Sequence, residues 1–196
     1  AALSNWDAGM DMYIYGKLGN LIMTKEGINV LMTNLTGKVP PILQRLDYIR
    51  FNGEAAGYLH DLTLTGLFYT GAGMVKTDVM MSIDEQSMSR TYSGSVASAD
   101  LDLGKLLNQE KKFGKVDFNV ELKGFNYKNR YPESYIKGII SSFEYSQYQY
   151  ENIMLDGVYK DGGFNGRLSM DDANGSVQIY GNFNVAKTIP DFNLKA

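Results

Sequence analysis

Residues 153–184 read IMLDGVYKDGGFNGRLSMDDANGSVQIYGNFN, and this stretch decides the fold class. It consists of three short segments that alternate apolar with polar residues, separated by turns rich in Asp, Asn and Gly. Alternation with a period of two is typical of strands that have one buried and one solvated face. Asn and Gly accept the positive φ angles that tight hairpin turns require. The stretch therefore predicts consecutive strands of an antiparallel sheet.

The same alternation continues through most of the chain and is clearest in residues 116–122, where Val, Phe, Val and Leu alternate with Asp, Asn and Glu. We therefore expect a single all-β unit over residues 1–196. Helices are expected at only two places. Residues 42–48 follow a Pro-Pro pair that suits a first helical turn, and residues 102–113 begin at Asp102, a suitable N-cap, and end at Gly114.

Glycines at mid-strand positions are the unusual feature of the pattern. Gly157, Gly166 and Gly181 fall on the same face as the large apolar residues, and the phrase apolar-x-Gly-x-apolar recurs at uneven spacing along the chain. An interior glycine weakens a strand and gives a core nothing to pack, but it also lets a strand coil or kink. Glycines that relieve crowding in an ordinary sandwich core are the alternative. The number of repeats favours a curved, mostly antiparallel sheet, a half-pipe with a hydrophobic groove.

Composition excludes several functional classes. The chain has 19 basic and 22 acidic residues and a net charge of −3, which argues against nucleic acid as a partner. It has no cysteine and a single histidine, His60, so neither disulfides nor thiolate metal sites are possible. We find no catalytic constellation and expect neither an enzyme nor a cofactor or metal. No apolar run approaches the length of a membrane helix, which predicts a soluble segment.

Aromatic residues gather in one place, residues 143–150 (FEYSQYQY), on both sides of an expected turn at Ser146 and Gln147. Cross-strand aromatic pairing in a hairpin explains this cluster. Tyrosines that stack on sugar rings or mark the interfacial girdle of an outer-membrane barrel are competing explanations. A closed β-sandwich that binds carbohydrate or protein through this cluster is therefore the alternative to a curved open sheet.

Several phrases of the sequence resemble the TamB proteins of the AsmA-like group. They are residues 155–166 (LDGVYKDGGFNG) with their continuation at 168–181, residues 51–53 with 66–73, and residues 102–107 (DLGKLL). The resemblance implies a long curved sheet with a hydrophobic groove, in a periplasmic protein anchored to the inner membrane. It also implies phospholipid acyl chains as ligands, and an outer-membrane barrel partner of the TamA type. Because family members are far longer, we expect this chain to be an internal section, with partner contacts elsewhere.

The functional hypothesis is thus phospholipid transport to the outer membrane, with support of outer-membrane protein assembly. A homodimer that covers the sheet edges and the apolar face is plausible for this section. The side chains predicted to line the groove are Val116, Phe118, Val120, Leu122, Phe164, Leu168, Met170, Val177, Ile179 and Phe183.

Overall fold

The structure is a computed structural model that describes residues 2–4, 11–36, 39, 41–58, 60–84, 86–87, 89–126, 133–161, 163–184 and 191–195. Its strands are β1 Ala2–Ser4, β2 Tyr13–Thr24, β3 Tyr48–Tyr58, β4 Asp61–Thr70, β5 Gly73–Asp84, β6 Ser89–Asp102, β7 Phe113–Asn126, β8 Glu133–Tyr145, β9 Tyr148–Lys160, β10 Gly163–Asp172, β11 Gly175–Asn184 and β12 Asp191–Lys195. Its helices are α1 Lys25–Thr36, the 3₁₀ helix η2 Leu43–Arg45 and α2 Leu103–Leu107.

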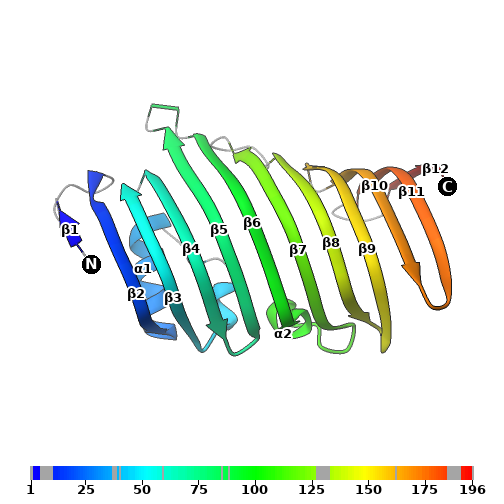
Figure 1. The fold of residues 1–196 in the computed structure, drawn as a ribbon, viewed down its shortest axis with the longest axis horizontal. Coiled ribbons are helices and arrows are strands. Elements are labelled where there is room, and N and C mark those ends of the chain that lie inside the picture. The colour runs from blue at the N-terminus through cyan, green and yellow to red at the C-terminus, as the bar shows by residue number, and fades with distance from the viewer. Residues whose placement is uncertain are drawn as a thin grey trace.

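All twelve strands belong to one antiparallel sheet in which the order across the sheet is the order along the chain (Figure 1). Among the described residues, each strand therefore pairs only with its neighbours in sequence. The expected hairpin turns are present, with Ser146 and Gln147 at positive φ between β8 and β9 and Asp161 at positive φ between β9 and β10. The all-β, antiparallel expectation is confirmed. The alternative of two sheets packed face to face is wrong, because the strands form a single sheet that does not close.

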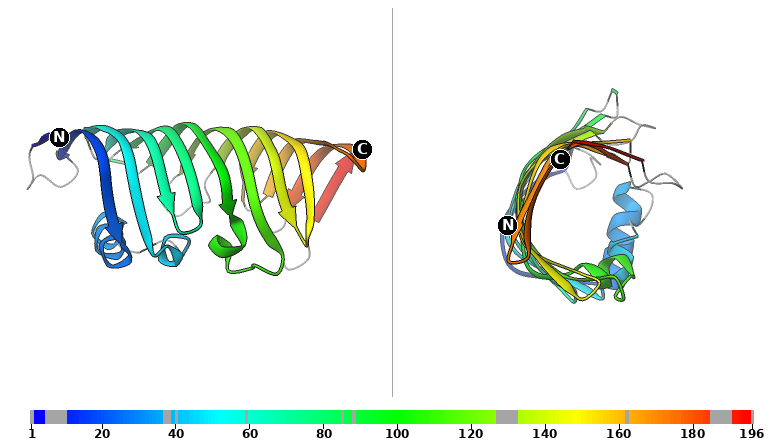
Figure 2. Two further views of the ribbon diagram at one scale, coloured as in Figure 1. Left: turned by 60° about the horizontal axis from the view of Figure 1, so that its bottom comes forward. Right: turned by 90° about the vertical axis from the view of Figure 1, so that its right-hand side faces the viewer.

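The sheet is curved about its long axis. Seen along that axis it forms a C-shaped arc, and α1 and α2 lie at the open side of the arc (Figure 2). We call the face toward the helices the inner face and the opposite one the outer face. Residues of the outer face are mostly exposed and those of the inner face mostly half-buried, which produces the alternating burial along β4, β7 and β8.

The mid-strand glycines lie on the inner face, where the curvature brings neighbouring strands together. Gly157, Gly166 and Gly181 pair directly across β9, β10 and β11. A Cβ on Gly166 would lie 2.4 Å from the carbonyl oxygen of Asp156 and 2.5 Å from the Cα of Gly157, distances that real Cβ atoms do not adopt. The ring of Phe164 occupies the space beside Gly157. These glycines thus make room for closely approaching backbone and for an aromatic ring lying along the sheet.

Bulges also contribute to the shape of the sheet near the end covered by α2. The register of β6 with β7 shifts between Ser98 and Leu101, and that of β7 with β8 shifts between Asp117 and Phe118. Asp100 in β6 and Asn152 in β9 have positive φ angles of 55° and 51°. A bulge bends its strand and increases the local twist, so the sheet turns toward the helices along this line.

Helix α1 is absent from the sequence-based expectations. Thr24 directly precedes it, and the Gly27 N–H donates to the Thr24 Oγ1 at 3.4 Å. The Lys25 N–H donates to the carbonyl of Asp47, which ties the start of the helix to the segment before β3. The signals that would have revealed it are a threonine in the N-cap position, Glu26 in the first turn, and apolar residues three or four apart from Ile28 onward.

The two expected helices are shorter than predicted. Residues 42–48 contain only η2, and β3 already begins at Tyr48. Residues 102–113 contain α2, which has Asp102 as its N-cap as expected, with the Lys105 N–H donating to Asp102 Oδ1 at 2.8 Å. Gly114 does not end this helix, because Asn108 caps it in the left-handed conformation with φ 56°.

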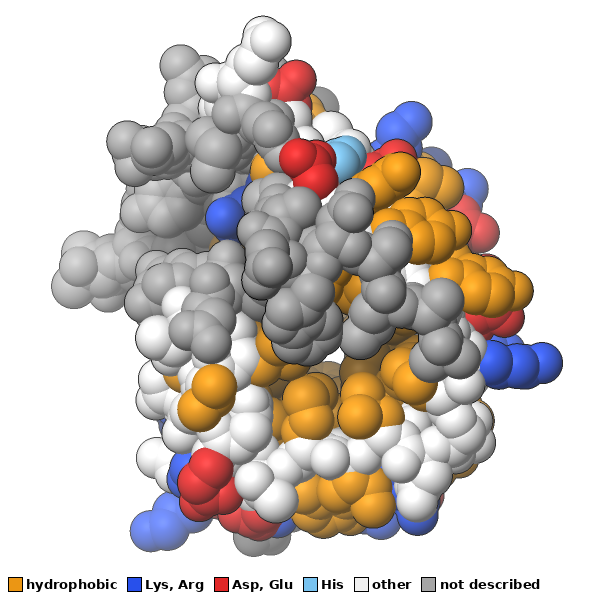
Figure 3. Space-filling model, turned by 90° about the vertical axis from the view of Figure 1, so that its left-hand side faces the viewer, with side chains coloured by type: hydrophobic (Ala, Val, Ile, Leu, Met, Phe, Trp, Pro, Cys, Tyr) orange, Lys and Arg blue, Asp and Glu red, His pale blue; other side chains and the backbone are white. Residues whose placement is uncertain are grey.

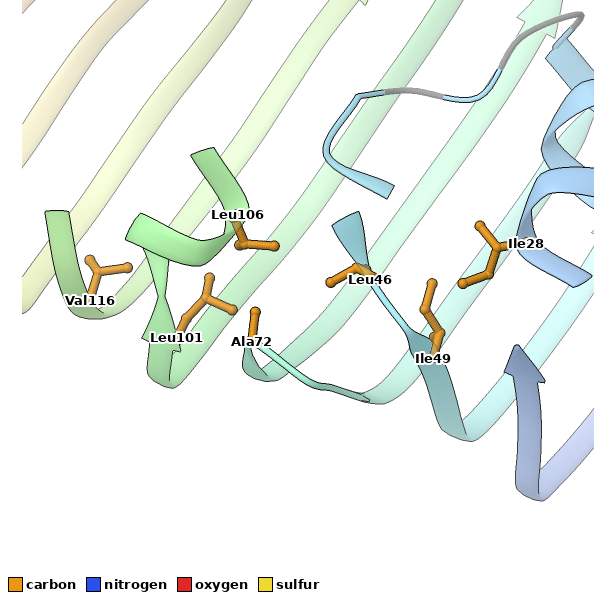
Figure 4. Close-up of a cluster of buried hydrophobic side chains, with 7 residues drawn as sticks. All are labelled: Ile28, Leu46, Ile49, Ala72, Leu101, Leu106 and Val116. Carbon is orange, nitrogen blue, oxygen red and sulfur yellow. The ribbon is translucent and has the colours of Figure 1, made fainter. Parts of the chain in front are cut away.

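The helices pack on the inner face through one cluster of buried apolar side chains, which we call the helix-covered core (Figure 4). The sheet contributes its share from β3, β6, β7 and the turn between β4 and β5. The Arg45 guanidinium also donates to the Leu106 carbonyl, which links η2 to α2. The core consists of Ile28, Leu46, Ile49, Ala72, Leu101, Leu106 and Val116.

Truncating Ile28 tests how much this core contributes to stability. Ile28 is 2% exposed, whereas Val30 in the same helix is 63% exposed. The Ile28→Ala substitution is expected to lower the free energy of unfolding by about 2–4 kcal/mol, through lost burial and the cavity left behind. Val30→Ala should change it by less than about 0.5 kcal/mol. Urea unfolding followed by circular dichroism measures both; equal effects would mean that α1 is not anchored through Ile28.

Candidate functional site

The inner face carries rows of apolar side chains that run along the long axis of the sheet. One such row crosses five neighbouring strands from β7 to β11. Its members are half-buried, apart from a glycine that contributes no side chain. Figure 3 looks from the end where β1 and β2 lie and shows a hollow with apolar side chains, in orange, along its lower border. The row consists of Val120, Gly138, Leu155, Leu168 and Ile179.

The structure places the predicted groove residues on this face with two qualifications. Val116 is buried in the helix-covered core rather than open on the inner face. The backbone of Phe183 pairs with Phe164, but the Phe183 side chain lies outside the described residues. The others are half-buried: Phe118, Val120, Leu122, Phe164, Leu168, Met170, Val177 and Ile179.

The prediction missed inner-face residues that the same alternation would have identified. Phe51 and Phe68 pair across β3 and β4 with ring centroids 4.7 Å apart, and the Phe51 ring lies over Gly53 and Gly66. Leu155 and Ile136 extend the apolar surface across β8 and β9. The apolar inner face thus extends from β3 to β11.

The outer face is polar along its middle. Glu121, Lys137, Asp156 and Arg167 lie directly opposite one another on β7 to β10, so charges of alternating sign face each other across the strands. Lys137 Nζ lies 3.8 Å from Asp156 Oδ2, and the Tyr135 hydroxyl donates to Asp156 Oδ1 at 2.7 Å, which raises the pKa of Tyr135. Alternating charges of this kind stabilise a sheet and keep its face solvated.

Two shallow open hollows are lined mainly by outer-face side chains. One, of about 460 Å³, lies beside Met80 and Phe125, and the other, of about 380 Å³, beside Ile139 and Met154. Side chains on a convex surface splay apart, which opens such gaps between long side chains. Neither hollow combines buried polar groups in a way that indicates a particular ligand.

The aromatic cluster of residues 143–150 lies on the inner face at the end near α2. Phe143 packs against the helix-covered core, and contacts between rings connect it to its neighbours at centroid distances of 4.5–6.4 Å. The bulge in β8 places Phe143 opposite Val116, on the same face as Ile140 three residues earlier. Phe113, at the start of β7, contacts Phe143 and Tyr145. Together with the aromatic residues of 143–150 it forms what we call the aromatic rim: Phe113, Phe143, Tyr145, Tyr148 and Tyr150.

Hydrogen bonds hold one side of the aromatic rim in place. The Tyr148 hydroxyl donates to Asp172 Oδ2 at 3.0 Å and accepts from the Asn174 side chain, in the turn between β10 and β11. The hydrogen bond from the Asn174 N–H is the main cause that lowers the pKa of Asp172 below its usual range. The Tyr148 hydroxyl and the Gly175 N–H lower it further. On the other side, the Ser146 N–H donates to the Lys112 carbonyl at 2.7 Å and ties the β8–β9 turn to the segment before β7.

Metal sites and membrane-spanning helices are absent from the part of the chain that the structure describes. No group of three or more His, Asp or Glu side chains there is placed to hold a metal ion. No helix among these residues is long and apolar enough to cross a membrane. His60 lies in the turn between β3 and β4, with its Nδ1 3.7 Å from Asp11 Oδ1.

Comparison with known proteins assigns the chain to no family: no family model, no curated protein and no solved structure matches it.

Proposed function

We propose that the inner face is a hydrophobic groove that shields lipid acyl chains, in a periplasmic section of a TamB/AsmA-like envelope protein. In this proposal the protein carries phospholipid to the outer membrane and supports outer-membrane protein assembly. The observation that supports it best is the row from Val120 to Ile179, which is apolar in strand after strand. These side chains stay half-buried because no second sheet covers them among the described residues.

Physical chemistry explains how such a face would serve transport without a polar site. Burying an acyl chain is worth about 0.8 kcal/mol per CH₂ group, or on the order of 10 kcal/mol for a long chain. Apolar contact is non-directional, so a chain lying along the row slides from Leu155 to Leu168 without breaking a particular bond. The row of alternating charges along the outer face would keep that face hydrated while the inner face holds lipid.

The sequence resemblance supplies the cellular context of this proposal. A periplasmic location, an inner-membrane anchor and a barrel partner of the TamA type belong to the longer protein, and its partner contacts would lie in other parts of it. In this proposal a second copy of this section would pair along β11, where, among the described residues, 175–179 pair with β10 but not with β12.

Lipid extraction tests the proposal directly. The chain is purified without detergent from bacterial lysate, denatured and extracted, and the extract is analysed by mass spectrometry. We expect phospholipid in an amount comparable to that of the protein. An extract free of any amphiphile, from protein shown to be folded by circular dichroism, would contradict the proposal.

A further inference from the structure

The aromatic rim lies where helical cover of the inner face ends. The sheet residues under α1, η2 and α2 come from β3 to β7, whereas no helix among the described residues packs on the inner face of β9 to β11. The rim bridges the two regions, since Phe143 contacts the helix-covered core and Tyr148 is bonded to the turn between β10 and β11. An opening beside the rim would therefore lead to the apolar row of Leu155 and Leu168.

Ring contacts and a hydrogen bond hold the side chains of the rim in place. Tyr148 and Tyr150 make an edge-on contact at 4.5 Å, and the hydrogen bond from Tyr148 to Asp172 fixes the first of these rings. Tyr145 packs on Phe113 at 5.4 Å and is still 38% exposed. A fixed aromatic surface loses little conformational freedom when a ligand contacts it.

Tyrosine suits one particular part of an amphiphile. Its ring is apolar and its hydroxyl is polar, so it prefers places where one end is dry and the other is wet. At the rim, the dry side is continuous with the inner face through Phe143, and the wet side faces solvent at Tyr145. These conditions match the boundary between an acyl chain and its polar head group.

We propose that the aromatic rim is the place where a phospholipid enters or leaves the inner face, with the boundary between chain and head group lying against Tyr145, Tyr148 and Tyr150. This inference rests on the proposed function, because it assumes that acyl chains occupy the inner face. It adds a lateral opening at β8 and β9 and a role for the tyrosines that the apolar row does not require.

Two probes separate this inference from the proposed function. One is a phospholipid with a fluorophore at the end of an acyl chain, presented in vesicles of phosphatidylethanolamine and phosphatidylglycerol. The other is diphenylhexatriene, a hydrocarbon without a head group. The test variant is Tyr145→Ser. The control is Tyr180→Ser. Tyr180 is 39% exposed and Tyr145 is 38% exposed, but Tyr180 lies on the outer face, opposite Arg167.

The Tyr145→Ser variant should bind the phospholipid about fivefold more weakly and bind diphenylhexatriene as the wild type does, while Tyr180→Ser changes neither. Two results for Tyr145→Ser would overturn the rim assignment and leave the proposed function intact: wild-type affinity for both probes, or an equal loss of affinity for both. If the wild-type chain binds neither probe, the proposed function fails and the inference fails with it.

A second measurement does not depend on removing the ring. Replacing Tyr145 or Tyr180 with the photoreactive p-benzoylphenylalanine retains an aromatic side chain at either position. Irradiation with vesicles should attach phospholipid at position 145 at least several times more efficiently than at position 180. Equal labelling at the two positions would contradict the proposed opening even if Tyr145→Ser proved unstable.

Discussion

The Gly166→Ala variant is expected to lose about 3 kcal/mol or more of its free energy of unfolding. The added Cβ would lie 2.4 Å from the Asp156 carbonyl oxygen and 2.5 Å from the Cα of Gly157. Both are backbone atoms, so a rotamer change cannot relieve the clash, and β9 and β10 must separate. Small domains have total stabilities of about 5–15 kcal/mol, so a loss of this size removes much of the margin.

Gly175 provides the matched control for this prediction. It begins β11 a few residues after Gly166, and a Cβ built on it has no atom within 4 Å. Gly175→Ala should therefore be neutral or slightly stabilising, because alanine restricts the unfolded chain. Urea unfolding of both variants gives the difference. A Gly166→Ala protein as stable as Gly175→Ala would show that the glycines are not needed for close approach of the strands.

The Ile179→Lys variant is expected to bind the acyl-chain phospholipid probe at least about 30-fold more weakly than the wild type. A lysine that faces lipid from a β-strand costs about 2–4 kcal/mol near the middle of the apolar region, and 1.4 kcal/mol corresponds to a factor of ten in affinity. Ile179 lies at the end of the apolar row, opposite Leu168. The charge would therefore interrupt the surface on which the chain is proposed to lie.

Gln178→Lys is the control, because Gln178 precedes Ile179 in the same strand but is exposed on the outer face. Both variants add one positive charge, so non-specific attraction to anionic vesicles is matched. Gln178→Lys should keep wild-type affinity. Comparable affinities of the two variants, with both proteins folded, would mean that acyl chains do not contact the inner face of β11.

Alternation predicted much of the sheet because β7, β10 and β11 keep a strict period of two along the residues predicted to line the groove. Phe118, Val120 and Leu122 thus share one face in the structure, as the sequence predicts. The turn at Ser146 and Gln147 was predictable for the same reason, since it interrupts two alternating runs. The mid-strand glycines predicted the curvature correctly, and the structure adds the contacts that explain it.

Features that depend on tertiary packing were not predictable. Strict alternation from Ile140 puts Phe143 on the outer face, but the bulge in β8 returns it to the inner face beside Val116. Nothing in the residues between them identifies that bulge. Helix α1 does carry helical signals in Glu26 and in the spacing of its apolar residues, but its valine, isoleucine and threonines favour strands, and its stability comes from burying Ile28 against the sheet. The sequence therefore predicts the aromatic cluster of residues 143–150 but not its position on the inner face.

The agreement between strand order and chain order has a consequence for how such a molecule can change in length. Neighbouring strands are about 4.8 Å apart, so duplicating or deleting one hairpin would lengthen or shorten the sheet by roughly 10 Å. No distant strand would need a new partner, because each strand that the structure describes pairs only with its sequence neighbours. The cross-section in Figure 2 would stay the same. In this architecture the length of the sheet is thus independent of the width of its cross-section. Selection or design can change the length without altering the cross-section.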